Sequence, residues 1–368
     1  MIIDHIGDGG AQQFLKRLSE ALSKKQLRVI VCCLQPSRHS EVIVSSQLFQ
    51  TIELSPHRFG LFGFLLLIRL IHRLQPEVVH THLAAANTIG VIAARINRVP
   101  KIFSHDHSGA EYANRFPITA KYAFFPLERF LSRFLVKLFA VSRHVANINI
   151  DVKKICPNKI VVLPNWIDID QFTYEAADRE YNRTALGLSV SSFVIGAVGR
   201  LSPEKGLTTL VESFATIAKS VPESYLFIAG DGPDKSTLEL KIEQLNLSNC
   251  IRLMGFKEDT KALYSALDLF ILPSHYETFG IALLEAMYCG LPVIASNVGG
   301  VPDLVRSGFN GIMVEPNNSD QLTSSILNII SDEHLRSSLG SNARISVIEK
   351  FDRDALLNKL LHYYQIRR

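Results

Sequence analysis

The chain has 368 residues, of which 47% are hydrophobic and 20% charged, a composition that excludes disordered, collagen-like and disulfide-scaffold proteins. This length exceeds what one ordinary hydrophobic core serves and predicts two α/β domains. The net charge of +4 is unevenly distributed, because residues 1–175 carry 21 Lys and Arg against 13 Asp and Glu, whereas residues 176–368 carry 18 against 22. The basic half predicts an anionic partner, such as phospholipid head groups or a lipid diphosphate.

The five cysteines are odd in number and lack the spacing of metal ligands, which predicts buried thiols in a reducing compartment. Asp4 and Asp8 stand where a signal peptide would be apolar. The longest apolar run, residues 59–68, is far shorter than the roughly 20 residues that span a bilayer. We therefore expect a cytoplasmic protein, at most peripheral on the inner face of the cell membrane.

Short β-branched runs alternate with longer helical patterns along the chain, which is the signature of parallel sheets with crossover helices. A helix is expected over residues 11–24, where apolar residues recur at helical spacing. The polar stretch 165–192 is expected to be an irregular linker between the halves. Strands are expected at 2–6, 28–34, 78–82, 101–104, 138–141, 160–163, 193–199, 225–229, 251–254, 269–272, 293–295 and 311–314.

The most informative motif spans residues 273–296, which read PSHYETFGIALLEAMYCGLPVIAS. A strand, a loop and a helix are expected in succession here, so Gly280 and Ile281 would lie at a helix N-terminus, where free amides and the macrodipole favour a diphosphate. Glu277 and Glu285 can accept hydrogen bonds from the hydroxyls of ribose and hexose. The alternative is structural, with Glu277 capping the helix and Glu285 on a solvated face.

This Glu-x7-Glu motif, followed by the Gly-Gly-Val-Pro of residues 299–302, closely resembles the signature of family 4 retaining glycosyltransferases, and the resemblance covers nearly the whole chain. It implies the GT-B fold, an α/β architecture of two Rossmann-like doubly wound domains facing each other across a cleft. It also implies that Glu277 contacts the transferred sugar and Glu285 the ribose. Three residues would then lie along the diphosphate: Phe279, Gly280 and Ile281.

The expected domains are residues 1–172, on the acceptor side, and residues 173–351, which bind the nucleotide-sugar donor. A C-terminal helix over about 352–368 is expected to pack back on the first domain.

A basic pair, Arg200 and Lys205, follows the first strand expected in the second half. The ends of parallel strands are where open α/β sheets bind ligands. Two fixed cations can neutralise the charge on a leaving diphosphate without a metal ion. The alternative is an ordinary exposed pair in a turn, but the spacing matches the arginine and lysine of the family. The resemblance therefore implies a metal-independent transferase without a cofactor.

Three further sites are expected around the donor. Gly9 and Gly10 follow the first strand, allow a close approach of the backbone to a ligand, and match the family's amino-terminal glycine loop. Residues 12–13 are Gln where the family often has Glu. Gly230 resembles a loop near the nucleotide, and Met254 is expected beside the base, although both also suit a scaffold role.

Two His-x-His pairs follow strands, His80 with His82 and His105 with His107. Imidazole is a common zinc ligand, but no Cys or carboxylate pattern converges on the pairs, so no metal site is expected. The resemblance implies a histidine close to the sugar, with His107 as first choice and His105 as the alternative. His80 and His82 are expected to be structural or to line the cleft.

Residues 58–73 and 114–137 combine large apolar side chains with Lys and Arg. Basic aromatic helices of this kind can lie in the interface of an anionic membrane. The alternative is that their phenylalanines pack against the sheet. The resemblance favours membrane contact, because many members of the family act on lipid-linked acceptors.

We therefore predict a retaining hexosyltransferase that uses a nucleotide-sugar donor, with UDP favoured over GDP, and a glycan or lipid-linked acceptor in cell-surface polysaccharide or glycolipid synthesis. Its predicted catalytic residues are Glu277, His107, Arg200 and Lys205. A nucleotide-sugar epimerase of the same fold and a non-catalytic sugar-nucleotide-binding protein remain alternatives. A nicotinamide-dependent dehydrogenase is disfavoured because residues 196–199 lack the Gly-x-Gly-x-x-Gly spacing. No nucleic-acid partner is expected, since no recognised module is present.

Overall fold

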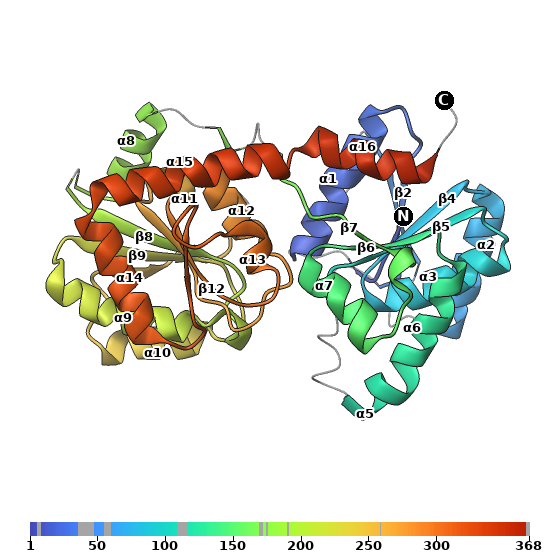
Figure 1. Cartoon of the computed structure of the whole chain (residues 1–368), viewed down its shortest axis with the longest axis horizontal. Coiled ribbons are helices and arrows are strands. Elements are labelled where there is room, and N and C mark those ends of the chain that lie inside the picture. The colour runs from blue at the N-terminus through green and yellow to red at the C-terminus, as the bar shows by residue number, and fades with distance from the viewer. Residues whose placement is uncertain are drawn as a thin grey trace. The chain divides into compact units, whose positions relative to one another are not determined.

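The computed structural model divides into two compact units (Figure 1). The first unit comprises Met1–Trp166 with Arg353–Arg368, and the second comprises Ile167–Asp352. The expected boundaries, after residues 172 and 351, lie six residues later and one residue earlier than these. The structure describes residues 1–5, 9–35, 48–54, 60–108, 117–168, 172–173, 176–189, 191–257 and 259–365.

The first unit is built on a seven-stranded parallel sheet with the order β3-β2-β1-β4-β5-β6-β7. The order reverses between β1 and β4, as in doubly wound folds. Its strands are β1 (Ile2–Ile3), β2 (Ile30–Cys33), β3 (Gln50–Glu53), β4 (Val78–His82), β5 (Lys101–Asp106), β6 (Lys137–Ala140) and β7 (Ile160–Val162). Its helices are α1 (Gly10–Lys24), α2 (Leu61–Leu74), α3 (Ala84–Ile96), α5 (Pro117–Thr119), η1 (Ala120–Phe124), α6 (Phe125–Leu131), η2 (Ser132–Phe134), α7 (Arg143–Asn147), η3 (Ile148–Val152), η4 (Pro157–Lys159) and α16 (Arg353–Tyr364).

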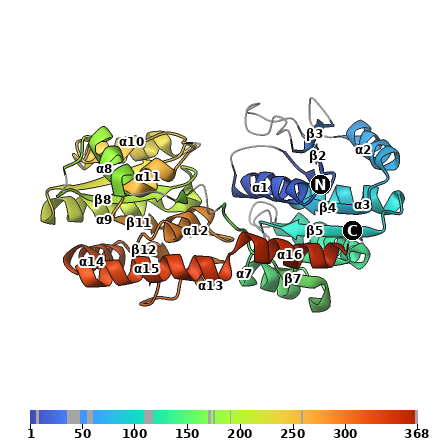
Figure 2. The ribbon, with the colours of Figure 1, turned by 90° about the horizontal axis from the view of Figure 1, so that it is seen from above.

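Alternating strand residues of the first unit serve two cores, one on each face of the sheet. Ile102 of β5 belongs to a cluster with side chains of α2, α3 and α6. Its neighbour Phe103 belongs to the opposite cluster, with Phe14 of α1 and Tyr364 of α16. Helix α16 lies next to β5 (Figure 2), where the rings of Phe103 and Tyr364 are 5.1 Å apart. The C-terminal helix is thus an integral layer of the first unit.

The second unit is built on a six-stranded parallel sheet with the order β10-β9-β8-β11-β12-β13, which reverses between β8 and β11. Its strands are β8 (Phe193–Val198), β9 (Ser224–Ala229), β10 (Ile251–Leu253), β11 (Leu269–Leu272), β12 (Val293–Ser296) and β13 (Ile312–Val314). Its helices are α8 (Ala176–Ala185), η6 (Pro203–Lys205), α9 (Leu207–Ser220), α10 (Lys235–Gln244), α11 (Lys261–Ala266), α12 (Ile281–Tyr288), α13 (Val301–Leu304), α14 (Ser319–Ser331) and α15 (Glu333–Lys350).

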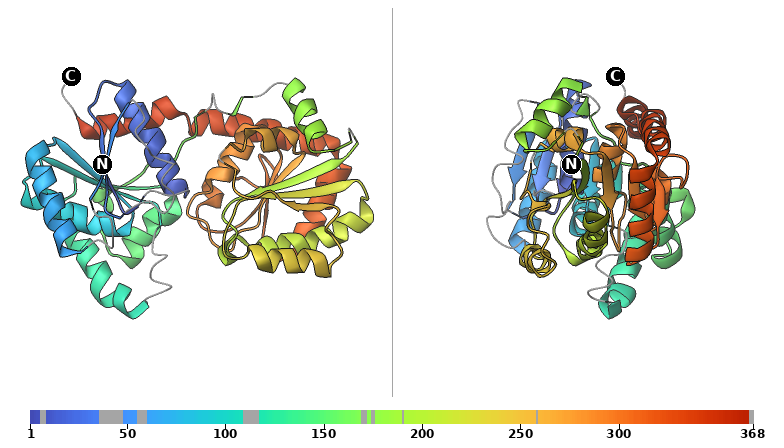
Figure 3. Two further views of the ribbon diagram at one scale, coloured as in Figure 1. Left: turned by 180° about the vertical axis from the view of Figure 1, so that it is seen from behind. Right: turned by 90° about the vertical axis from the view of Figure 1, so that its left-hand side faces the viewer.

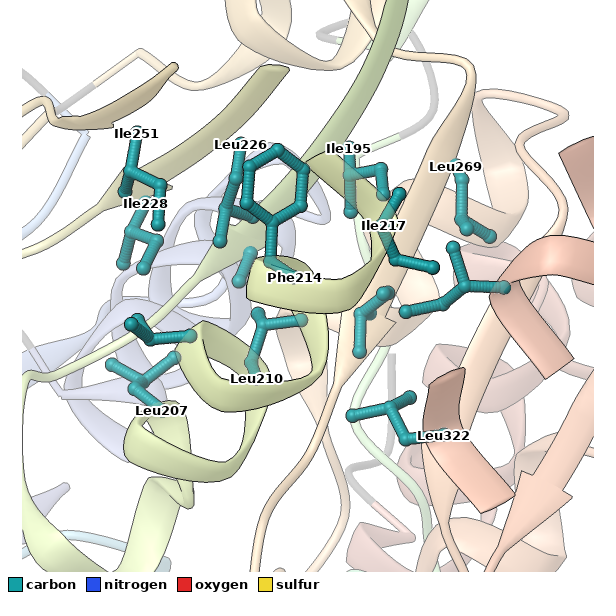
Figure 4. Close-up of a cluster of buried hydrophobic side chains, with 14 of the residues drawn as sticks. Ile195, Leu207, Leu210, Phe214, Ile217, Leu226, Ile228, Ile251, Leu269 and Leu322 are labelled. Atoms are coloured by element: carbon teal, nitrogen blue, oxygen red, sulfur yellow. The ribbon is translucent and has the colours of Figure 1, made fainter. Parts of the chain in front are cut away.

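Helices cover both faces of the second sheet, as its apolar strands require. Figures 1 and 3 show α9 and α10 on one face, and Figure 1 shows α8, α11 and α12 on the other. The core under α9 is drawn in Figure 4, where Phe214 lies over Leu226 and Ile195 of the strands. This packing fixes the strand ends from which the site loops emerge.

The expected irregular linker at 165–192 is wrong in part, because it contains α8. Arg183 of this helix donates to Asp268 at 3.1 Å and to the carbonyl of Ala266 at 3.0 Å. These bonds tie α8 to the second unit, where it packs on α11. Strand β3 is a further element that the strand pattern did not predict. Among the described residues, no helix is long and apolar enough to cross a membrane.

Candidate functional site

The loops after β8 and β11 meet at the point where the strand order of the second sheet reverses, which is where doubly wound sheets bind ligands. Lys205, in the loop after β8, donates from Nζ to Oε2 of Glu277 at 2.6 Å. Ser274 donates to the same carboxylate oxygen at 3.5 Å. The structure therefore joins two residues that are 72 positions apart and that the sequence predicted for one site.

Glycine at position 206 allows this meeting. Gly206 has φ +62°, and a Cβ there would lie 2.1 Å from the carbonyl oxygen of Pro273. The two loops are joined by a backbone hydrogen bond of 2.8 Å, from the amide of His275 to the carbonyl of Glu204. Only a residue without a side chain fits at this approach, and the adjacent Lys205 is thereby directed at Glu277.

Two further glycines, Gly299 and Gly300, contact the backbone of Glu277. Gly299 has φ +53°, and a Cβ there would lie 1.8 Å from the carbonyl oxygen of Glu277. The amide of Gly300 donates to that carbonyl at 2.9 Å. The N-cap residue of α12 is Gly280, which has no side chain, and the Glu277 carboxylate accepts from the side chains of Lys205 and Ser274 instead. The alternative reading of Glu277 as a helix cap is therefore wrong.

The loops after β8, β9 and β10 contact one another near the Lys205–Glu277 pair. A Cβ at Gly230, where φ is +145°, would lie 1.8 Å from the carbonyl oxygen of Gly199. The amide of Gly230 donates to the carbonyl of Gly255 at 2.8 Å, which brings it next to the half-buried Met254. Arg200, which follows Gly199 in the chain, is exposed. A small pocket lies at the ends of β8 and β11, lined by residues that include Gly199, Lys205 and Pro273.

Helix α12 begins directly after Gly280, where φ is +98°. Its first turn starts at Ile281, and its N-cap glycine has no side chain to bond the free backbone amides, which suits an anion. Phe279 is only 2% exposed, and its ring packs on Phe351 with centroids 5.8 Å apart. Only the backbone of Phe279 is thus placed to line a ligand.

Glu285 is 6% exposed and accepts a hydrogen bond of 3.2 Å from the hydroxyl of Tyr264. The alternative of a solvated face is wrong. Burial, and after it the charge of Glu285, raises the pKa of Tyr264 well above its usual value, so this hydroxyl stays protonated and donates. Sequence reasoning missed Tyr264, because it lies on another helix with no motif around it.

In the first unit, Gly9 and Gly10 are exposed at the start of α1. Gly9 is the N-cap residue, and its carbonyl accepts from the amides of Gln12 and Gln13 at 3.1 Å. The side chain of Gln12 lies 3.3 Å from Nε2 of His5. The Gln12 side chain, where the family often has Glu, thus contacts this histidine.

The four predicted histidines form one buried cluster on a single face of β4 and β5. His82 pairs in register with His105, and its Nδ1 lies 3.1 Å from Nε2 of His107. Burial, and after it His80, lowers the pKa of His107 to about 3. Burial also lowers the pKa values of His80, His82 and His105 well below their usual value. All four are therefore neutral imidazoles at neutral pH.

The two candidates for the sugar-side histidine are both buried and differ only slightly in exposure. His105 is fully buried, with Nε2 at 3.3 Å from the carbonyl of Leu163, whereas His107 is 7% exposed. The other face of β5 holds an ion pair that the sequence did not indicate. Asp106 accepts from Lys153 and from Asn149, each at 2.9 Å. This buried network fixes the end of β5 and so the positions of both histidines.

Two doubly wound units of this topology are the architecture of the GT-B fold, and comparison with known proteins specifies the family. Residues 8–171 match Glycosyltransferase Family 4, and residues 178–346 match Glycosyl transferases group 1. A relative from Escherichia coli, UDP-Gal:alpha-D-GlcNAc-diphosphoundecaprenol alpha-1,3-galactosyltransferase, is 30% identical over 302 residues, which cover 81% of this chain and 77% of the relative. The chain belongs to the family 4 glycosyltransferases.

Two further comparisons agree. The capsular polysaccharide biosynthesis glycosyltransferase CapM of Staphylococcus aureus is 28% identical over 310 residues, covering 82% of this chain and 80% of the relative. The crystal structure of Anabaena HepE in complex with UDP and glucose superimposes with a TM-score of 0.83 at 25% identity, covering 98% of this chain and 97% of that one. The family resemblance and the fold class expected from the sequence are confirmed.

Proposed function

We propose that this glycosyltransferase moves a hexose from a UDP-sugar to a glycan or lipid-linked acceptor, with retention of configuration and without a metal ion in the transfer step. The observation that carries the proposal is the 2.6 Å contact between Lys205 and Glu277 at the reversal point of the second sheet. The name of the Escherichia coli relative specifies a UDP-sugar and a diphosphoundecaprenol acceptor, and the HepE crystal contains UDP. In this proposal the second unit binds the donor and the first binds the acceptor.

The donor diphosphate would be held by charge and by amides. Lys205, which lines the small pocket at the ends of β8 and β11, and the exposed Arg200 supply two cations in the loop after β8. The N-terminus of α12, at Gly280 and Ile281, adds backbone donors. Preorganised donors of this kind stabilise the negative charge that develops on a leaving diphosphate. In this proposal the two cations and the backbone amides stabilise the leaving diphosphate without a metal ion.

Glu277 would contact the transferred sugar, and Glu285 the ribose. Retention follows if the acceptor attacks from the face on which the diphosphate leaves, and we assign no covalent nucleophile. His107 would lie beside the sugar as a neutral hydrogen-bond partner, because its pKa of about 3 leaves it unprotonated at neutral pH.

The acceptor side would rest on a membrane. The segment α5–η1–α6 exposes Ile118, Tyr122 and Phe130 by 75%, 72% and 49%. Lys121 and Arg129 are exposed on the same segment. An apolar surface flanked by cations suits the interface of an anionic leaflet. We therefore place the enzyme on the inner face of the cell membrane, where lipid-linked acceptors are presented.

Thermal unfolding with a panel of nucleotides tests the donor. UDP is expected to raise the melting temperature of the protein, since a ligand at 100 times its dissociation constant adds about 2.7 kcal/mol to the free energy of unfolding. The shift should shrink in Lys205→Ala and persist in Lys219→Ala, an exposed lysine of α9 in the same unit. A selective response to GDP would reassign the base. A response to NAD alone, or to no nucleotide, would contradict the proposal.

A further inference from the structure

We propose that the histidine cluster of the first unit is a binding site for a divalent transition metal ion of the Zn²⁺ class, with His80 Nε2, His82 Nε2 and His105 Nδ1 as ligands. One ring nitrogen of each of these three histidines lies within 4.8 Å of the corresponding nitrogens of the other two, in the interior of the unit. This inference goes beyond the proposed function, since it concerns a site that holds the first unit together and takes no part in the transfer step.

Strand geometry brings the ligands together. Side chains two positions apart share a face of a strand, so His80 and His82 lie on one face of β4. His105 is the register partner of His82 on the adjacent parallel strand. Imidazole nitrogens bind zinc at about 2.0–2.1 Å, which places the nitrogens of a tetrahedral ion about 3.4 Å apart. The rings would have to move closer together than the present spacing, which is within 4.8 Å, to bind such an ion.

The second nitrogen of each ring already has a partner, as metal-bound histidines require. Nδ1 of His80 lies 2.6 Å from the hydroxyl of Tyr364, and Nδ1 of His82 lies 3.1 Å from Nε2 of His107. Nε2 of His105 lies 3.3 Å from the carbonyl oxygen of Leu163. A carbonyl only accepts, so His105 carries its proton on Nε2 and directs a lone pair from Nδ1.

The three remaining nitrogens are the three proposed ligand atoms. His80 Nε2, His82 Nε2 and His105 Nδ1 are buried, and among the residues that the structure describes none offers them a hydrogen bond. All three side chains are at most 1% exposed. Imidazole nitrogen is a ligand suited to Zn²⁺, Co²⁺, Ni²⁺ and Cu²⁺. A bound ion would satisfy all three atoms at once and link β4, β5 and, through Tyr364, helix α16.

The experiment uses the full chain without a histidine tag, stripped of metal and titrated with Co²⁺ and with Zn²⁺. One equivalent of Co²⁺ should bind and give a visible absorption band. Trp166, the sole tryptophan, lies in the same aromatic cluster, with its ring 4.7 Å from Phe14, which in turn lies 5.3 Å from His105. Its fluorescence should be quenched by Co²⁺, and Zn²⁺ should raise the unfolding temperature that it reports.

Matched variants locate the ion. His80→Asn, His82→Asn and His105→Asn should each abolish the cobalt spectrum, whereas His72→Asn, an exposed histidine of α2, should retain it. Tyr364→Phe should weaken binding by about 10- to 100-fold. If the histidine variants do not fold, a crystal grown with Co²⁺ decides, because anomalous scattering must peak between the three nitrogens. A peak elsewhere, no binding by the native chain, or an unchanged spectrum in the variants would overturn the proposal.

Discussion

At Gly206 the backbone adopts φ +62° and passes so close to the carbonyl of Pro273 that a Cβ would lie 2.1 Å from it. Gly206→Ala is therefore expected to destabilise the second unit by about 3 kcal/mol, of which the left-handed conformation alone accounts for about 1 kcal/mol. The substitution should also weaken UDP binding, since Lys205 directly precedes Gly206 in the chain. Urea unfolding and UDP titration measure the two effects.

Gly187 provides the matched control, because its φ is +71° and a Cβ there would meet nothing within 4 Å. Gly187→Ala should cost only the conformational part, about 1 kcal/mol, and leave UDP binding unchanged. Equal losses of unfolding free energy and of UDP affinity in the two variants would show that the close approach at Pro273 does not position Lys205.

Some residues of the candidate site could be predicted from the sequence, and some of their partners could not. Glu277 and Lys205, whose side chains are in contact, could be predicted as site residues because each lies in a spaced motif. The Tyr264 partner of Glu285 was not found, because a hydrogen bond between two helices leaves no periodic signal in the chain. The convergence of His80 with His105 depends on strand register, which a sequence pattern of period two does not specify between strands.

At the scale of elements, α5–η1–α6 offers the clearest test of membrane contact. The double variant Tyr122→Glu with Phe130→Glu places two charges on its exposed apolar side chains, 72% and 49% exposed in the native chain. Binding to vesicles that contain anionic lipid should fall at least tenfold, while the melting temperature stays within about 2 °C because neither side chain is buried. Co-sedimentation measures the binding.

Tyr181 of α8, in the second unit, is 74% exposed and serves as the control position. Tyr181→Glu should leave vesicle binding unchanged. Native binding that is insensitive to salt and to the double variant would place the membrane surface elsewhere on the protein.

Most elements could be predicted from hydrophobic pattern, and the exceptions have physical reasons. Strand β4 matches its expected range of 78–82, because three of its five residues, in the sequence VVHTH, are β-branched. Strand β3, with the sequence QTIE, lies at the sheet edge, where polar residues are tolerated. Helix α8 is polar in sequence, and its arginines bond to Asp268 and nearby carbonyls, which no pattern within 165–192 shows.

At the scale of the whole molecule, α16 returns the chain to the first unit and completes its core. Leu360 is fully buried in the cluster that contains Trp166. Leu360→Ala should lower the stability of the first unit by about 2–5 kcal/mol, from lost burial and the cavity left behind. Trp166 is the only tryptophan, so its fluorescence reports the unfolding of this unit alone.

Leu240→Ala, at a side chain of the second unit that is 59% exposed, should leave the Trp166 transition where it is. An unchanged transition in Leu360→Ala would mean that α16 adds little to the first unit.

The central claim, that the chain transfers a sugar from a nucleotide donor through Glu277 and Lys205, is tested most directly by UDP release from a panel of UDP-sugars with a lipid-linked acceptor. Glu277→Gln keeps the size of the side chain and removes the charge that Lys205 contacts at 2.6 Å. We predict that its kcat falls at least 100-fold with the fold intact, whereas Glu239→Gln, at an exposed position of α10, keeps native turnover. Near-native turnover in Glu277→Gln, or no turnover of any nucleotide-sugar by the native chain, would contradict the account.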